Sequence, residues 1–212
     1  MVRAFDLFWS IAGLAVLSPL FLLVGALVKL ADGGPVFYRQ ERIGRGGVPF
    51  RILKFRTMRT DADRVGTLIT VGRDPRITPV GAFLRRWKID ELPQLVNVVR
   101  GEMGLVGPRP EVPRYVALYT PDQARVLRLR PGVTDVASIA YRYENDLLQG
   151  CPDPEAFYVQ RILPDKIRIN LEYAARASVW SNFKVILATL GLLSPPIAPV
   201  RPSEHSASGR MD

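Results

Sequence analysis

An apolar run near the N-terminus constrains the fold of this chain most. Residues 7–28 carry no charged side chain, and at a rise of about 1.5 Å per residue a helix of this length reaches across the hydrocarbon core of a bilayer. Ser18 and Pro19 lie near the middle of the run, where a proline removes a helical hydrogen bond and crowds the preceding turn. We therefore expect a helix–break–helix over residues 1–30.

Three placements of this segment are open: a kinked helix that spans the membrane, a pair that enters and leaves on the same face, and a helix buried in a protein core. Arg3 precedes the apolar run and Lys29 follows it. Because cationic flanks remain on the cytoplasmic side, both ends satisfy this tendency only in the re-entrant form. The flanking charges therefore favour re-entry.

The overall charge limits the partners of the chain. Its 29 Lys and Arg against 20 Asp and Glu give a formal net charge of +9, which favours an anionic partner: a nucleic acid, a phosphorylated small molecule or a lipid surface. The one cysteine, Cys151, cannot form a disulfide within the chain, and the one histidine, His205, lies in a polar tail. Any chemistry must therefore use carboxylates, hydroxyls, Lys and Arg.

Residues 35–58 predict a β-hairpin around the glycine-rich turn Gly44–Gly47. Lys54 and Arg56 are two positions apart on the second strand, so they share one face. Two interpretations are open. The cations either face a phosphate or keep an exposed edge strand soluble.

The stretch that follows predicts a helix from about Gly81 that leads into two adjacent acids. Its apolar face has helical spacing and consists of Val80, Phe83, Leu84 and Trp87. Continued along the helix, the same face reaches Glu91, with Asp90 at its edge, unless Pro93 ends the helix. In that case Asp90 would cap a second helix, and the helix dipole would favour the negative charge of Glu91 in the first turn of that helix. Otherwise the two acids can serve as nucleophile, base or metal ligands.

Arg109 lies between Pro108 and Pro110. The prolines stiffen the backbone on both sides, so the guanidinium is presented rigidly, as bidentate phosphate binding requires. An ordinary loop arginine is the other interpretation.

Residues 74–110, "DPRITPVGAFLRRWKIDELPQLVNVVRGEMGLVGPRP", resemble the signature of the bacterial sugar transferases that act on polyprenyl phosphate, the monotopic phosphoglycosyl transferases. The resemblance extends to the Ser-Pro break, to "KFRTM" at 54–58, to "RPGVT" at 130–134 and to "PDKIRINLEY" at 164–173. We expect the compact form, without the multi-span region of larger members. Gly104 and Asp135 depart from the usual pattern. The second departure leaves the loop after Thr134, including residues 138–146, without a family interpretation, although selection of the sugar or the nucleobase is one role that this loop could have.

The resemblance implies an α+β fold. Its parts are a re-entrant membrane helix–break–helix over 1–30 that turns at Ser18 and Pro19, and one catalytic domain over 31–193 at the membrane interface. This domain contains a small β-hairpin and several amphipathic or interfacial helices. The Pro- and Ser-rich residues 194–212 are expected to form a disordered tail.

The resemblance also implies an activity. A sugar 1-phosphate moves from a UDP-sugar to undecaprenyl phosphate with release of UMP, on the cytoplasmic face of the bacterial inner membrane. Asp90 is the implied nucleophile that forms a covalent phosphosugar intermediate, and Mg²⁺ is the implied cofactor, with Asp90 and Glu91 as its ligands. Attack of a carboxylate on a diphosphate also requires cations, and Lys54, Arg56, Arg85 and Arg109 are the cations expected to bind the phosphates. The product would begin assembly of an exopolysaccharide or another glycoconjugate, which downstream glycosyltransferases extend.

Two other classes of function are weighed against this one. A membrane-anchored nucleic-acid-binding protein would suit the charge, but the sequence has no helix-turn-helix, zinc or RNP-like pattern, and we expect no nucleic-acid partner. A non-catalytic scaffold could retain the fold. The sequence does not identify the sugar, the pathway or the oligomeric state.

Overall fold

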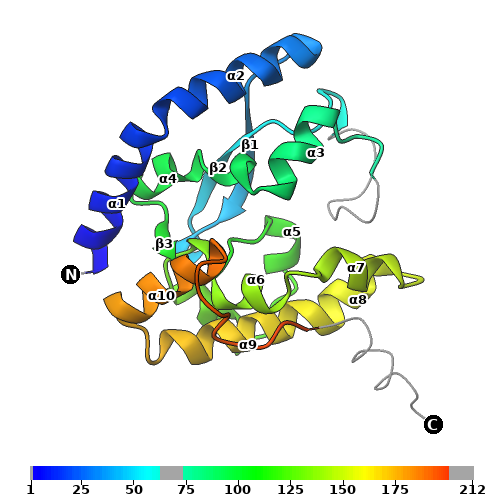
Figure 1. Cartoon of the computed structure of the whole chain (residues 1–212). Coiled ribbons are helices and arrows are strands. Elements are labelled where there is room, and N and C mark those ends of the chain that lie inside the picture. Colours follow the sequence, from blue (N-terminus) through cyan, green and yellow to red (C-terminus); the bar gives the residue numbers. More distant parts are fainter. Residues whose placement is uncertain (1, 63–73, 201–212) are drawn as a thin grey trace.

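The computed structural model describes residues 2–62 and 74–200, and it shows helices arranged around two small two-stranded sheets (Figure 1). The helix pair α1 and α2 forms one side of the molecule, α9 and α10 lie on the opposite side, and the β1–β2 hairpin lies between them. The first half contains α1 (Val2–Val16), α2 (Ser18–Asp32), β1 (Phe37–Ile43), β2 (Pro49–Phe55), α3 (Pro79–Arg86) and α4 (Gln94–Arg100). The second half contains β3 (Gly104–Val106), α5 (Pro113–Val116), β4 (Gly132–Thr134), α6 (Val136–Ala140), α7 (Glu144–Gln149), α8 (Pro154–Phe157), α9 (Leu163–Ala174) and α10 (Val179–Thr189).

The predicted break in the N-terminal segment is confirmed. The axes of α1 and α2 differ by 61°, and the break falls at Leu17. Pro19 lies in the first turn of α2, where its missing N–H is tolerated, and the Ser18 hydroxyl donates to Ala15 O at 2.8 Å. Neither helix is long and apolar enough to cross a membrane alone, whereas the bent pair together has the length and composition to do so.

The helix pair has one face against the protein and one face exposed. Asp6 and Ser10 of α1 and Val24 and Val28 of α2 are buried. The exposed large side chains include Phe8, Trp9, Val16, Leu22, Leu23 and Leu30. An exposed apolar face excludes the interpretation of this segment as a buried core helix.

The predicted hairpin is also confirmed, with a register that runs from Phe37 opposite Phe55 to Ile43 opposite Pro49. Leu53 and Phe55 are buried on one face and Lys54 points to the other, as the alternation of a strand requires. The strand ends at Phe55, so Arg56 lies just beyond it.

Helix α3 corrects one expectation about its apolar face. Leu84 is buried in the cluster that joins α2, β2 and α3, but Phe83 and Trp87 are 57% and 63% exposed. The periodicity of α3 therefore marked an apolar surface that only partly packs into the protein.

A tight contact between β3 and β4 fixes the position of the Arg109 loop. The two strands pair in parallel, with Gly104 opposite Gly132. A side chain at Gly107 would meet Arg130 O at 2.3 Å, and one at Gly132 would meet Gly107 N at 2.1 Å. Both positions therefore require glycine, because any Cβ would force the two backbones apart.

The end of the described chain returns to the body of the protein. Val200 packs against the main hydrophobic cluster, and its N–H donates to Ala140 O at 2.8 Å. The remainder of the expected tail, residues 201–212, lies outside the described residues. The domain boundaries at residues 30 and 193 stay predictions.

Candidate active site

A short irregular connection between α3 and α4 positions the two acids. Lys88 adopts a left-handed conformation with φ 57°, and the 3₁₀ turn Ile89–Glu91 follows it. Helix α4 begins only at Gln94, after Pro93, so Asp90 does not cap it. The helix-cap interpretation of Asp90 is therefore wrong.

Asp90 is buried, with 7% of its surface exposed. Its Oδ1 atom has no hydrogen-bond partner within residues 2–62 and 74–200. Burial, and then the charge of Glu91, raise the pKa of Asp90, while Lys54 and Arg85 act in the opposite direction. A buried carboxylate oxygen without a partner is costly in a folded protein, which marks Asp90 as a group adapted to meet a ligand.

Glu91 is held by two cations. Its Oε1 atom accepts from Lys54 Nζ and from Arg109 Nη2, both at 2.7 Å, and its Oε2 atom accepts from Arg109 Nη1 at 3.3 Å. Burial alone would raise the pKa of Glu91, but Arg109 and Lys54 outweigh burial and hold this pKa well below its usual range. Glu91 therefore stays ionised and fixes both cations beside Asp90.

Of the other two predicted cations, one reaches the acids and one has a different partner. Arg85 Nε donates to Thr57 Oγ1 at 2.8 Å. Burial lowers the pKa of Arg85, whereas the negative charge of Asp90 raises it. Both Nη atoms of Arg56 bind the Asp32 carboxylate, and its Nε donates to Pro35 O at 2.6 Å. Arg56 thus connects the end of α2 to the hairpin, and its role in phosphate binding stays a prediction that requires this ion pair to open.

The acids line a cavity of about 1120 Å³ whose wall includes residues from α3, α5, α7 and α9. The cavity wall beside α3, which we call the basic flank, includes Arg59, Arg76, Arg85 and Lys88. A second part of the wall, which we call the tyrosine flank, includes Arg42, Glu111, Tyr115, Glu144, Tyr158 and Lys166. Asp90, Glu91, Lys54 and Arg109 also line this cavity. The site can therefore hold a large ligand that has a charged part and a neutral part.

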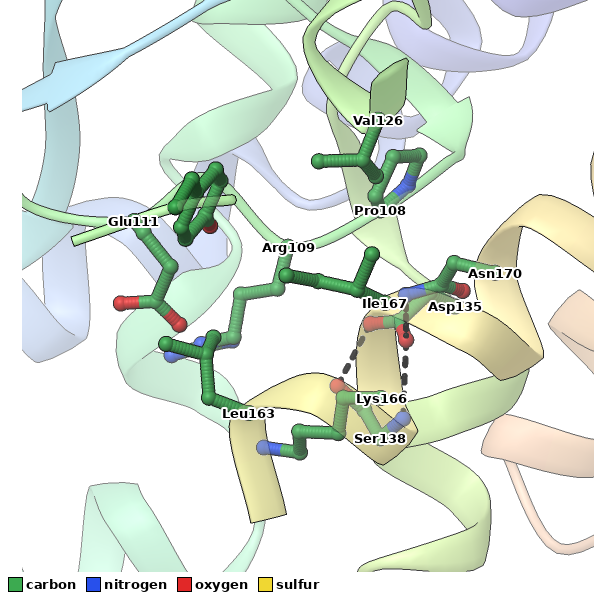
Figure 2. Close-up of a pocket in the computed structure, with 11 residues that line it drawn as sticks. Pro108, Arg109, Glu111, Val126, Asp135, Ser138, Leu163, Lys166, Ile167 and Asn170 are labelled. Carbon is green, nitrogen blue, oxygen red and sulfur yellow. Dashed lines mark hydrogen bonds between the residues drawn. The ribbon is translucent and has the colours of Figure 1, made fainter. Parts of the chain in front are cut away.

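A second, smaller cavity of about 30 Å³ lies behind Arg109 (Figure 2). Arg109, Glu111 and Lys166 line both cavities and so form the wall between them. On the far side of the small cavity the Asp135 carboxylate accepts from Ser138 N at 2.9 Å and from Asn170 Nδ2 at 3.1 Å. Asp135, one of the departures from the family pattern, therefore caps α6 and gives the wall behind Arg109 a polar support.

Comparison with known proteins assigns the family. The sequence profile of the family described as "Bacterial sugar transferase" matches residues 1–194. The chain belongs to the bacterial sugar transferase family. The match covers all of the described elements, from α1 to α10.

Several curated members of this bacterial sugar transferase family are similar to the chain. The exopolysaccharide production protein ExoY of Sinorhizobium fredii is 46% identical over 155 residues, which cover 66% of this chain and 69% of that protein. The UDP-glucose:undecaprenyl-phosphate glucose-1-phosphate transferase of Caulobacter vibrioides is 38% identical over 83% of this chain and 63% of its own length. A protein of the same name from Escherichia coli is 36% identical, and the match spans 89% of this chain and 41% of that protein.

The site of this sugar transferase includes residues that sequence reasoning missed. Glu111 directly follows the Pro-Arg-Pro motif, and Lys88 precedes the acids by two positions, so both had a nearby signal. Lys166 lies in the family-like stretch 164–173, but nothing in that stretch indicated that its side chain reaches the cavity. Tyr158 had no signal, because it lies far along the chain and reaches the cavity only through tertiary packing.

Proposed function

We propose that this protein transfers a sugar 1-phosphate from a UDP-sugar to undecaprenyl phosphate and releases UMP. The observation that carries the proposal is the buried, unpartnered Asp90 carboxylate oxygen beside a Glu91 that fixes Lys54 and Arg109. The names of the relatives from C. vibrioides and E. coli support this donor and acceptor, and that of ExoY supports a place in exopolysaccharide production. Assembly would then continue through downstream glycosyltransferases.

The residues suit a reaction in two steps. Lys54, Arg85 and Arg109 offset the charge of the donor diphosphate, so that the Asp90 carboxylate can approach the phosphorus that carries the sugar. A bond forms between this carboxylate and the phosphorus, and the bond to the UMP oxygen breaks, with its electron pair leaving on UMP. An oxygen of undecaprenyl phosphate then attacks the same phosphorus and Asp90 departs as a carboxylate. The soluble donor and the membrane-bound acceptor therefore need not be in the site together.

The acids fit a magnesium ion held partly by the substrate. Mg²⁺ commonly takes one or two carboxylates together with substrate phosphates, and the unpartnered Asp90 Oδ1 is a suitable oxygen ligand. Within residues 2–62 and 74–200, no group of three or more acidic, His or Cys side chains could hold an ion by itself. Glu91 could join as a ligand only by loosening its bonds to Lys54 or Arg109. When bound, Mg²⁺ would neutralise charge that develops on the diphosphate.

We propose further that α1 and α2 form a re-entrant membrane segment at the cytoplasmic face of the inner membrane, where UDP-sugars are available. Both ends of the pair are attached to the same body of protein, because Arg3 Nη2 donates to Val99 O at 3.2 Å and Asp32 pairs with Arg56. Two ends that share one body lie on one side of a bilayer. The exposed Phe83 of α3, which packs against α2, and Trp87, which directly follows α3, extend the apolar surface toward membrane lipid.

The activity is tested by supplying a panel of UDP-sugars with undecaprenyl phosphate and Mg²⁺ and measuring UMP. At least one donor should give UMP and the sugar-linked lipid diphosphate in equal amounts. A protein that binds a nucleotide sugar but never releases UMP would be a scaffold. Binding of an oligonucleotide at physiological salt, with an affinity that falls as the salt concentration rises, would instead favour the nucleic-acid alternative.

The re-entrant placement predicts the accessibility of both ends of the helix pair. In a Cys151→Ser background, a cysteine at the exposed position 4 and one at the exposed position 31 should both react with a membrane-impermeant maleimide only from the cytoplasmic side. Labelling of either from the periplasm of intact cells would contradict the proposal. A known periplasmic cysteine in the same cells serves as the positive control.

A further inference from the structure

The tyrosine flank contains a set of buried polar side chains that the proposed transfer step does not use. Tyr158 is 5% exposed, and its hydroxyl donates to Glu111 Oε1 at 2.5 Å. The other carboxylate oxygen of Glu111 lies 3.8 Å from Arg42 Nη1. These three side chains come from separate parts of the chain and form one wall of the large cavity.

Lys166 and Glu144 complete the flank. The Lys166 ammonium binds the Glu144 carboxylate and lies 5.8 Å and 5.7 Å from the ring centroids of Tyr141 and Tyr158. The Lys166 and Glu144 side chains keep 14% and 27% of their surfaces exposed and line the large cavity. They can therefore meet a ligand without a rearrangement of the core.

The local backbone is unusual at this place. Residues Tyr158–Ile162 form a π-helical turn between α8 and α9. Such turns are rare and often accompany functional sites, because the extra residue changes the direction of the side chains around it. Here the turn allows Tyr158 to reach Glu111 while Lys166, two helical turns later, still reaches the same cavity wall.

The charges of the two flanks suit different parts of one ligand. The basic flank gathers arginine and lysine around the acids and suits phosphate. The tyrosine flank balances Glu111 and Glu144 with Arg42 and Lys166, so it offers charged donors and acceptors without a net charge. This combination suits a neutral ligand with several hydroxyl groups, each of which can donate to a carboxylate or accept from an ammonium group.

The same wall is less suited to a flat base. Tyr115 and Tyr158, the tyrosines of this flank, are 3% and 5% exposed, and Lys166 lies over the Tyr158 ring. Stacking of a base requires an open ring face. The Glu144 side chain is the more exposed member of the Glu144–Lys166 pair, and both side chains line the cavity.

We propose that the tyrosine flank binds the sugar of the nucleotide donor, and that Glu144 and Lys166 determine which sugar is accepted by hydrogen-bonding its hydroxyls. This inference rests on the proposed function. Activity of the unaltered protein with any UDP-sugar tests that function, whereas comparison of variants with the unaltered protein tests the flank, so failure of one is distinguishable from failure of the other.

The experiment compares Glu144→Gln and Lys166→Met with the matched controls Glu172→Gln and Lys184→Met, which lie at exposed positions outside the cavity. Each flank variant should lower kcat/KM for the accepted UDP-sugar by about 10- to 100-fold, as expected for loss of a hydrogen bond to a charged group. Competitive inhibition by UMP, which has no sugar, should change by less than about twofold. The controls should match the unaltered protein in both measurements.

Donors that lack one sugar hydroxyl make the assignment specific. In the unaltered protein, the deoxy donor that lacks the recognised hydroxyl should be poor, and in the matching variant this penalty should disappear. An equal loss of UMP inhibition would assign the flank to the nucleoside and overturn the proposal. Unchanged kcat/KM in both variants would overturn it as well.

A charge-swapped variant, Glu144→Lys with Lys166→Glu, addresses a purely structural role. The swap retains an ion pair and should keep the thermal unfolding temperature of the unaltered protein within a few degrees, yet it should still change the preferred sugar. Wild-type preference in the swapped protein would show that the pair only supports the fold.

Discussion

Replacing Asp90 with Asn is expected to abolish both overall transfer and the covalent phosphosugar adduct. A neutral amide is a poor nucleophile and a weaker ligand for Mg²⁺, so the rate should fall by at least about 10³-fold. The side chain keeps its size, and its Oδ1 position has no hydrogen-bond partner to lose within the described ranges. The variant should therefore fold as the unaltered protein does.

The decisive measurement is release of UMP without undecaprenyl phosphate. A two-step enzyme should give a burst of about one equivalent per active site, with a matching mass increase on the peptide that contains Asp90. Asp90→Asn should give neither signal. If the unaltered protein is active with the lipid present but shows no burst and no adduct, the covalent mechanism is wrong, and Asp90 acts as a base or a metal ligand.

Replacing Glu91 with Gln is expected to damage stability and activity together. The change leaves Lys54 and Arg109 without the largely buried anion that they share. Breaking a fully buried ion pair from one side costs about 3–5 kcal/mol, and the partial exposure of Arg109 should reduce this cost to about 1–3 kcal/mol of unfolding free energy. Activity should also fall, because these two cations would no longer be fixed beside Asp90. The matched control is Glu172→Gln, whose partner Arg168 is 58% exposed and whose loss should cost about 1 kcal/mol or less.

The pH dependence of this stability difference has a definite sign. The folded protein holds the pKa of Glu91 well below the usual 4.5, so ionised Glu91 contributes stability above that pH and loses the contribution as the pH falls. The difference in unfolding free energy between the unaltered protein and Glu91→Gln should therefore shrink on acidification. Chemical unfolding in a nonionic detergent measures it. A difference that grows toward low pH would show that Glu91 is not stabilised as an anion.

The sequence predicted correctly the features of the fold that depend on a few neighbouring residues. Pro19 broke the apolar helix, and the turn Gly44–Gly47 formed the hairpin, because each effect depends on the backbone of a few neighbouring residues. Lys54 and Arg109 were singled out from the sequence, and both bind Glu91, whereas their role in phosphate binding stays a prediction.

The sequence did not predict side-chain contacts between residues that lie far apart in the chain. Arg56 shares a face pattern with Lys54, yet Asp32, 24 residues earlier, binds it. Periodicity could not distinguish the core-facing Leu84 of α3 from the exposed Phe83 and Trp87, because an apolar stripe has the same spacing whether it meets protein or another apolar surface. The tyrosine flank depends on tertiary packing. No motif predicted Tyr158, and the family-like stretch 164–173, which contains Lys166, did not predict that Lys166 reaches the cavity.

The close contact of Gly107 with β4 has a consequence for engineering the donor preference of this protein. Glu144 and Lys166 keep part of their side-chain surface exposed in the cavity, so a library at these positions can explore new polar groups. Gly107 and Gly132 leave no such freedom, because a single methyl group at either would displace the loop that carries Arg109. A library for new substrates should therefore randomise the cavity wall and hold these two glycines constant, although neither has a functional group.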